Sequence, residues 1–238
     1  MAIAIIGASG GIGRALCQTL EKANPARPIY AISRSAKVPS GQSIRPLSMD
    51  IEDEDSIRAA AAEIKARGYL SAIIIATGML SDAALNIGPE KSWRDQAFPN
   101  FEKVFAVNTF GPALVAKHFL PLLARKERVL FAALSARVGS ISDNHLGGWH
   151  AYRASKAALN MLIRNYALEL GWRNDQSICV SLHPGTVSTD LSSKFVTSRA
   201  RKVFSPQEAA GYLVTVMNAL TPADTGKVFD WQGEEIPF

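Results

Sequence analysis

Tyr152 and Lys156 are the residues of this sequence whose types and spacing point most directly to chemistry. Side chains four positions apart in a helix lie on the same face, about 5–6 Å from each other. An ammonium beside a phenol favours the phenolate, so we expect the pKa of Tyr152 to fall from its usual value of about 10 toward neutral pH. Such a pair can give and take a proton. Because this spacing also occurs by chance, its meaning depends on the rest of the sequence.

A glycine-rich segment near the start of the chain gives the pair its context. The apolar run Ala2–Ile6 predicts a buried strand, and the residues from Arg14 onward predict a helix. Between them, residues 7–13 carry glycines spaced G-x-x-x-G-x-G, slightly wider than the common dinucleotide pattern. A strand, a glycine turn and a helix aim backbone N–H groups at a pyrophosphate. An ordinary tight turn is the alternative interpretation, which the flanking elements disfavour.

Together the two motifs resemble the short-chain dehydrogenase/reductase family, and the resemblance runs over nearly the whole chain. Further matching positions are Asp50, Ala76-Thr77-Gly78, Asn108 and Pro184-Gly185. Residues 134–144 are most similar to the C-factor-like, or carbonyl-reductase-like, branch. Membership implies hydride transfer between NADPH and a carbonyl or alcohol substrate. A dinucleotide-binding signalling or regulatory protein with little turnover is the alternative function that this branch implies.

The end of the second predicted strand bears on which nicotinamide cofactor binds. NAD selection commonly uses an acidic side chain about 20 residues beyond the glycines, whereas an arginine accommodates the 2′-phosphate of NADP. Here the strand ends in Ser33 and Arg34, and no Asp or Glu occurs between Glu21 and Asp50. An arginine can hold a phosphate through two N–H groups and stack on the adenine. We therefore predict that NADP(H) is preferred, with NAD(H) as the alternative.

The resemblance also implies where the cofactor makes its contacts. Asp50 and Ile51 would line the adenine pocket; Asp50 can also be interpreted as the N-cap of the following helix, and both roles could hold. Val187 and Thr189 would fix the nicotinamide carboxamide. The expected cofactor-binding residues are Gly7, Ser9, Gly11, Ile12, Gly13, Ser33, Arg34, Asp50, Ile51, Ala76, Thr77, Gly78, Tyr152, Lys156, Pro184, Gly185, Val187 and Thr189.

Three of the residues expected to be catalytic take part in the transfer of the proton to the substrate. By the resemblance, Tyr152 is the general acid/base that protonates the forming alkoxide, and Lys156 holds the nicotinamide ribose and keeps the phenol acidic. Asn108 bends its helix and steadies a water on the lysine. His183, at a predicted strand end, is interpreted as a packed residue rather than an acid or base.

The fourth expected catalytic residue is the serine that binds the substrate carbonyl. Ser135, at the end of the fifth predicted strand, is our candidate. Alignment on Gly139 instead places Ala136 in the position that the family serine occupies. The loop that follows is also longer than usual, so Ser140 and Ser142 are the alternatives.

Alternating apolar runs and helical stretches supply the scaffold. Strands are predicted at Ala2–Ile6, Ile29–Ser33, Ile44–Ser48, Ser71–Ala76, Arg128–Leu134, Ser177–His183 and Lys227–Asp230, and helices at Glu54–Arg67, Phe101–Leu123, Tyr152–Leu170 and Pro206–Leu220. This pattern predicts one α/β domain over residues 1–238: a single-domain Rossmann-type doubly wound parallel sheet of seven strands with helices on both faces. The order 3-2-1-4-5-6-7 follows, for its last strands, from the resemblance.

Residues 189–205 are expected to form a lid over the substrate. Apolar side chains in this stretch suggest a partly hydrophobic ligand; they are Phe195, Val196, Val203 and Phe204.

Composition disfavours several other classes of protein. A content of 47% hydrophobic and 20% charged residues is typical of a folded domain, and no apolar run reaches the ~18 residues of a membrane span. The first strand is predicted to begin at residue 2, so we expect no signal peptide. The two cysteines and four histidines have no metal-ligand spacing, and the net charge of +5 is scattered. We expect a cytoplasmic protein that binds no metal, nucleic acid or membrane.

Two predicted helices suggest self-association. In the family that this chain resembles, the helices corresponding to Phe101–Leu123 and Tyr152–Leu170 pair with their copies in a partner subunit. The apolar positions of the second spread around more of the helix than one sheet-facing stripe needs. We therefore expect a homo-oligomer, a dimer or a tetramer, whose other partner is a small-molecule substrate.

Overall fold

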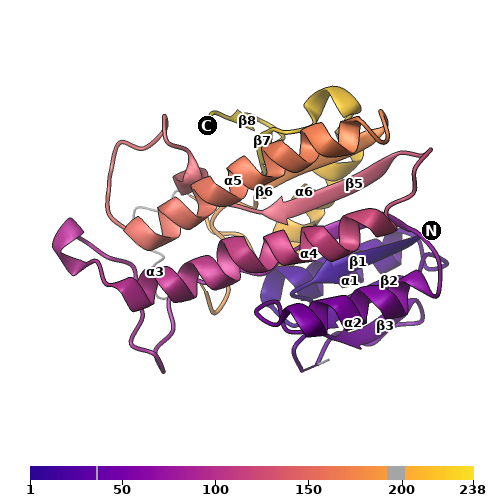
Figure 1. Ribbon diagram of the computed structural model, residues 1–238, viewed down its shortest axis with the longest axis horizontal. Coiled ribbons are helices and arrows are strands. Elements are labelled where there is room, and N and C mark those ends of the chain that lie inside the picture. Colours follow the sequence, from indigo (N-terminus) through magenta and orange to yellow (C-terminus); the bar gives the residue numbers. More distant parts are fainter. Residues whose placement is uncertain (36, 192–201) are drawn as a thin grey trace.

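The computed structural model describes residues 1–35, 37–191 and 202–238, and its strands and helices alternate along the chain (Figure 1). The strands are β1 (Ala2–Ile6), β2 (Ile29–Ser33), β3 (Ile44–Ser48), β4 (Leu70–Ile75), β5 (Val129–Leu134), β6 (Ser177–His183), β7 (Val228–Asp230) and β8 (Glu235–Ile236). The helices are α1 (Gly11–Ala23), α2 (Glu54–Lys65), α3 (Phe98–Phe105), α4 (Gly111–Phe119), α5 (His150–Gly171) and α6 (Pro206–Ala219). The predicted bounds of the first seven strands agree with these to within one residue.

Within the described residues the sheet has eight strands rather than the predicted seven, in the order β3-β2-β1-β4-β5-β6-β7-β8. The first seven are parallel and take the predicted order. The additional strand, β8, pairs antiparallel with β7, so that Val228 faces Ile236 and Phe229 faces Glu235. A strand of two residues is too short to show any hydrophobic periodicity, which is why the prediction missed it.

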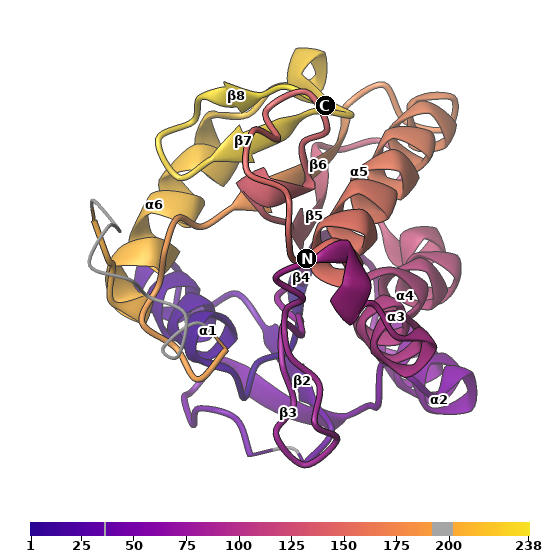
Figure 2. The ribbon, with the colours of Figure 1, turned by 90° about the vertical axis from the view of Figure 1, so that its left-hand side faces the viewer.

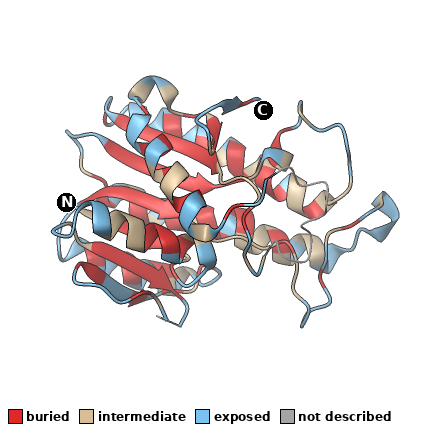
Figure 3. Cartoon of the chain, turned by 180° about the vertical axis from the view of Figure 1, so that it is seen from behind, coloured by how far each residue is buried: buried red, intermediate tan, exposed pale blue. Residues whose placement is uncertain are grey.

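Helices cover both faces of the sheet, as a parallel sheet requires. In Figure 2, α1 and α6 lie on one side of the sheet and α2, α4 and α5 lie on the other. Successive strand residues therefore enter opposite cores. Ile3 and Ile5 pack with α1 and α6, whereas Ala4 and Ile6 pack with α2, α4 and α5. The central strands are buried along nearly their whole length (Figure 3).

The long helix predicted at Phe101–Leu123 is interrupted in the structure. It consists of α3 and α4 joined by a π-helical turn at Ala106–Phe110. A π turn inserts an extra residue into the hydrogen-bond ladder and often marks a functional position. Asn108 lies in the middle of this turn and is buried. The interruption therefore agrees with the expected role of Asn108 in bending its helix.

Helix α5 presents apolar side chains to solvent as well as to the sheet. Met161 and Leu168 are 62% and 48% exposed. We predict that α4 and α5 pair with their copies in a symmetric dimer, because such side chains gain by burial. Light scattering at micromolar protein concentration should then report about twice the 25.6 kDa of one chain. A mass of 25.6 kDa would rule out the stable dimer.

None of the helices in the described part of the chain is both long enough and apolar enough to cross a membrane.

Candidate active site

The glycine turn after β1 packs directly against the turn after β4. Gly7 has a φ of +88°, and a Cβ on it would lie 2.9 Å from the backbone of Ala76 and Thr77. A Cβ on Gly13 would lie 2.2 Å from the carbonyl oxygen of Gly7. Only glycine fits at these two positions, because real Cβ contacts are essentially never so short, and at Gly7 the φ is also one that L side chains rarely adopt. The turn therefore brings the start of α1 to the carboxyl edge of the sheet.

The N-terminus of α1 has features that favour an anion. The helix begins at Gly11, its N-cap residue Gly10 makes no side-chain cap hydrogen bond, and its first turn contains no acidic residue. Uncapped N–H groups and the helix dipole together favour a phosphate at this position. A Cβ on Gly11 would lie 2.9 Å from Cγ2 of Thr189, so the segment after β6 reaches over the helix start.

Two adjoining cavities of about 490 Å³ and 440 Å³ follow the carboxyl edge of the sheet from β3 to the segment after β6. The first is lined by residues that include Gly7, Ser9, Ser33, Arg34, Asp50, Ile51, Ala76, Thr77 and Gly78, and the second by residues that include Gly11, Ile12 and Thr189. They share Gly10, Arg34, Ala76, Gly78 and Met79, which makes them one groove. An elongated groove at this edge is where doubly wound sheets bind dinucleotides.

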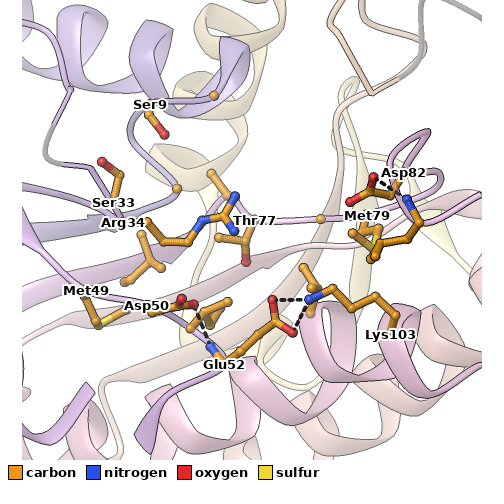
Figure 4. A pocket seen from close by; sticks show the side chains of 18 of the residues that line it. Ser9, Ser33, Arg34, Met49, Asp50, Glu52, Thr77, Met79, Asp82 and Lys103 are labelled. Carbon is orange, nitrogen blue, oxygen red and sulfur yellow. Dashed lines mark hydrogen bonds and ion pairs between the residues drawn. The ribbon is translucent and has the colours of Figure 1, made fainter. Parts of the chain in front are cut away.

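Two polar side chains that line the groove lack a hydrogen-bond partner within the described part of the protein. Among the described residues, the hydroxyls of Ser33 and Thr77 are buried and have no hydrogen-bond partner. The Arg34 side chain lies at the same cavity and points into it (Figure 4). Buried polar atoms are normally satisfied, so the two free hydroxyls indicate a hydrogen-bonding ligand. Together with the glycine turn and the N-terminus of α1, they fit a phosphorylated dinucleotide.

Asp50 lies on the wall of the first cavity, where the resemblance placed the adenine pocket. Its Oδ1 accepts the Glu52 N–H at 3.0 Å. The alternative interpretation, that Asp50 caps α2, is wrong, because Asp53 is the N-cap and accepts the N–H groups of Asp55 and Ser56. Asp50 therefore remains available at the cavity.

Lys156 and Asn108 meet beside the groove. The ammonium of Lys156 is buried and donates to the carbonyl oxygen of Leu134 at 2.8 Å. A Cβ on Gly78 would lie 3.7 Å from Lys156 Nζ and 3.8 Å from Asn108 Oδ1. Both side chains thus stand against the same glycine that lines the cavities. Tyr152, one turn before Lys156 on α5, is half-buried next to them.

Asn108 joins three elements through its side chain. Its Oδ1 accepts the Met79 N–H at 2.8 Å, and its Nδ2 donates to the Met79 carbonyl at 2.9 Å and to the Ser155 hydroxyl at 3.0 Å. The Ser155 hydroxyl donates in turn to the carbonyl of Tyr152 at 2.8 Å. The π turn, the segment after β4 and α5 are therefore fixed to one another around the proposed catalytic residues.

The pKa directions at this site differ from the expectation for Tyr152. Burial raises the pKa of Tyr152 to about 12 and lowers the pKa of Lys156 to about 8. The ammonium stands 5.9 Å from the centroid of the phenol ring and donates to Leu134. Desolvation therefore outweighs the attraction between the ammonium and a phenolate. The expected fall of the Tyr152 pKa is wrong for this arrangement, and the phenol is protonated at neutral pH.

The three candidate serines are all engaged with protein partners. Ser135 is 4% exposed, and its hydroxyl donates to Oδ1 of Asn160 at 2.8 Å. The hydroxyl of Ser140 accepts the Asp143 N–H at 3.1 Å, and Ser142 donates to the carbonyl of Phe238. None of the three lines the groove. The serine that binds the substrate carbonyl therefore stays a prediction.

Single replacements distinguish the three serines. If Ser135 turns toward the substrate carbonyl, Ser135→Ala should lower turnover by a lost hydrogen bond of about 1 kcal/mol or more, with the NADPH dissociation constant unchanged. Ser140→Ala and Ser142→Ala should then be nearly silent in the same steady-state assay. The reverse pattern would mean that the longer loop supplies the hydroxyl.

The first residues after β6 pack against the protein and do not line the two cavities. Val187 is 4% exposed and forms an isolated parallel bridge with Phe204. Pro184, Gly185 and Val187 line neither of the two cavities, in contrast to Thr189. Burial lowers the pKa of His183, at the end of β6, to about 4, which agrees with its interpretation as a packed, neutral residue.

The expected lid is described only at its two ends. Residues 192–201, with Phe195 and Val196, lie outside the described residues. Val203 is 42% exposed. Phe204 is 2% exposed, and its ring centroid lies 4.6 Å from that of Trp231 and 5.2 Å from that of Tyr212. The Phe204 ring is therefore part of a packed aromatic cluster, and the expectation of a partly hydrophobic ligand stays a prediction.

Several lining residues were not predicted from the sequence. Glu52 and Lys103 form an ion pair of 2.7 Å at the rim of the first cavity (Figure 4). Glu52 comes from the segment between β3 and α2 and Lys103 from α3, far apart in the sequence, so no motif connects them. Met79 and Asp82, from the segment after β4, also line this cavity.

No group of side chains in the described parts of the chain has the composition and geometry to hold a metal ion.

Residues 1–200 match the protein family described as short chain dehydrogenase. The groove, the glycine turn and the paired tyrosine and lysine are thus found in a chain that belongs to the short-chain dehydrogenase family.

Several characterised proteins and solved structures are similar to this chain. The C-signal protein of Myxococcus xanthus is 34% identical over 167 residues, which cover 69% of this chain and 96% of that protein. A 1-hydroxy-2-glutathionyl-2-methyl-3-butene dehydrogenase of a Rhodococcus species is 27% identical and covers 94% of both chains. The NADPH-bound carbonyl reductase from chicken fatty liver superposes with a TM-score of 0.85 at 26% identity, over 100% of this chain and 98% of that chain. The carbonyl reductase Sniffer of D. melanogaster, at 24% identity, has the same fold, with a TM-score of 0.85.

Proposed function

We propose that this protein is an NADP(H)-dependent oxidoreductase that reduces a small carbonyl compound to the alcohol, with Tyr152 as the proton donor. The observation that carries the proposal is the position of Lys156 and Asn108. Both stand next to Gly78 on the wall of the dinucleotide groove, and Lys156 lies one helical turn from Tyr152 on α5. Binding a dinucleotide alone requires no buried lysine and half-buried phenol at that position.

The side chains divide the chemistry among them. When bound, the nicotinamide dinucleotide supplies the hydride. Tyr152, whose pKa burial raises to about 12, holds its proton at neutral pH and donates it to the carbonyl oxygen of the substrate. Lys156, with a pKa lowered to about 8, can hold the cofactor ribose and return a proton to the tyrosine. Asn108 keeps α5 and the segment after β4 at a fixed distance.

Preference for the phosphorylated cofactor follows from the charge of the groove next to β2. Arg34 lines the cavity, Ser33 offers a free buried hydroxyl, and no Asp or Glu occurs between Glu21 and Asp50. The guanidinium and hydroxyl can bind a 2′-phosphate, and the acidic residue that commonly binds a 2′-hydroxyl at the end of this strand is missing. The NADPH bound in the chicken carbonyl reductase supports the same choice.

A second candidate function is dinucleotide-dependent signalling with little turnover. The 34% identity with C-signal favours it, and so does Ser135, whose hydroxyl is bound to Asn160 rather than facing the groove. Oxidation of NADPH, followed by its absorbance, with aldehydes, ketones and quinones separates the two functions. The proposal expects saturable turnover with at least one of these classes. Tight NADPH binding without turnover of any compound would favour the signalling function.

A further inference from the structure

Helix α5 begins without a cap of its own. Its N-cap residue, Trp149, makes no side-chain cap hydrogen bond and has left-handed backbone angles of φ 53° and ψ 43°. Tyr152 is the third residue of this helix, so the phenol depends on how well the first turn is held. The first N–H groups of a helix need partners from outside it, and a helix end without them frays.

Glu90, from the segment between β4 and α3, supplies one of these partners and also binds the N-cap residue. Its carboxylate Oε2 accepts the Ala151 N–H at 3.3 Å, and its backbone carbonyl accepts the Trp149 N–H at 2.6 Å. The residue is only 4% exposed. A carboxylate at a helix N-terminus also interacts favourably with the helix dipole. Glu90 thus caps α5 from a distant part of the chain.

The loop that enters α5 needs this support because its backbone is strained. Gly147, Gly148 and Trp149 have successive positive φ values of 64°, 66° and 53°. Left-handed backbone is unfavourable for a bulky residue such as tryptophan and persists only where its surroundings enforce it. The Trp149 ring in turn meets the Tyr152 ring edge-on, with centroids 6.3 Å apart. A shift of this loop would therefore move the ring that contacts the phenol.

The segment that carries Glu90 is anchored at both ends. At Met79 it is bound through two hydrogen bonds to the side chain of Asn108. Near its other end, Ile87 packs against Val104 of α3 and Ala151 of α5 in a small separate core. Residues 79–90 therefore connect Asn108 to the helix turn that bears Tyr152.

We propose that Glu90 is a positioning residue, whose buried carboxylate fixes the first turn of α5 and thereby the orientation of the Tyr152 phenol. The inference rests on the proposed function for its catalytic consequence. Its structural consequence, an ordered first turn of α5, does not depend on turnover.

Three variants separate the position of the carboxylate from its charge. Glu90→Gln keeps the length and an acceptor oxygen, Glu90→Asp keeps the charge but is too short to reach Ala151, and Glu90→Ala removes both. A misplaced catalytic group lowers the rate of reaction strongly. Turnover should therefore fall about tenfold or more in Glu90→Asp and Glu90→Ala, and stay within about threefold of the parent value in Glu90→Gln. The NADPH dissociation constant should stay within about twofold in all three. Glu169→Ala, at an exposed position near the other end of α5, is the matched control.

Hydrogen exchange of the ligand-free protein gives a readout that needs no activity. Amides of residues 150–156 should exchange faster in Glu90→Asp and Glu90→Ala, and at the parent rate in Glu90→Gln and Glu169→Ala. The second half of α5 should be unchanged in all of them. Unaltered exchange in the Asp variant, or equal losses of turnover in Gln and Asp, would overturn the inference. If the parent protein turns over no carbonyl, the proposed function fails, and exchange alone decides the role of Glu90.

Discussion

Tyr152→Phe should lower carbonyl reduction by at least ~10²-fold and leave NADPH affinity almost unchanged. The substitution keeps the ring and its edge-on contact with Trp149 but removes the hydroxyl that is proposed to donate the proton. Steady-state turnover on the best substrate, together with fluorescence titration of NADPH, measures both effects. Near-normal turnover in this variant would remove Tyr152 from the mechanism.

Tyr166→Phe is the matched control, because Tyr166 lies on the same helix and packs edge-on against Phe131 in the core. It should retain full turnover. Lys156→Ala should behave differently from both, since the ammonium is expected to contact the cofactor ribose as well as to assist the phenol. In Lys156→Ala, the affinity for NADPH and the rate of turnover should both fall.

Arg34→Asp should weaken NADPH binding by ~2 kcal/mol or more, which is about thirtyfold in the dissociation constant. The change removes a charge-assisted contact with the 2′-phosphate and adds a repulsive carboxylate. The same carboxylate can bind the 2′-hydroxyl of NADH, so relative use of NADH should rise. Titrations with both cofactors, on the parent and the variant, measure the shift.

Arg125→Asp, at an exposed loop position, controls for the change in net charge alone. This variant should leave the dissociation constants of NADPH and NADH unchanged. The account of cofactor choice would be wrong if the parent protein bound NADH as tightly as NADPH.

Features with a local signal were predictable from the sequence. The buried strands are short apolar runs, as at Ala2–Ile6 and Ser177–His183, and the structure has both with the same bounds. The start of α6 is another example, because Ser205 and Glu208 form the capping box that their spacing indicates. Tyr152 and Lys156 were predictable as a pair because a helix fixes how far apart they lie.

Features that depend on distant contacts were not predictable. Glu90 caps a helix that begins 60 residues later, and the Glu52–Lys103 ion pair joins residues 51 positions apart. The pKa of Tyr152 depends on how deeply the phenol is buried, which sequence spacing does not reveal. The partner of Ser135 is Asn160 on α5, so the direction of that hydroxyl follows from helix packing rather than from the motif around it.

Transfer of deuterium from NADPH labelled at C4 to the product tests the central claim most directly. With a carbonyl compound that the protein reduces, mass spectrometry should find one deuterium in the alcohol from one of the two C4-labelled stereoisomers and none from the other, because a fixed groove presents a single face of the nicotinamide. Tyr152→Phe should form this product at least ~10²-fold more slowly. An alcohol without deuterium from either isomer, or NADPH binding with no carbonyl compound reduced, would contradict the account.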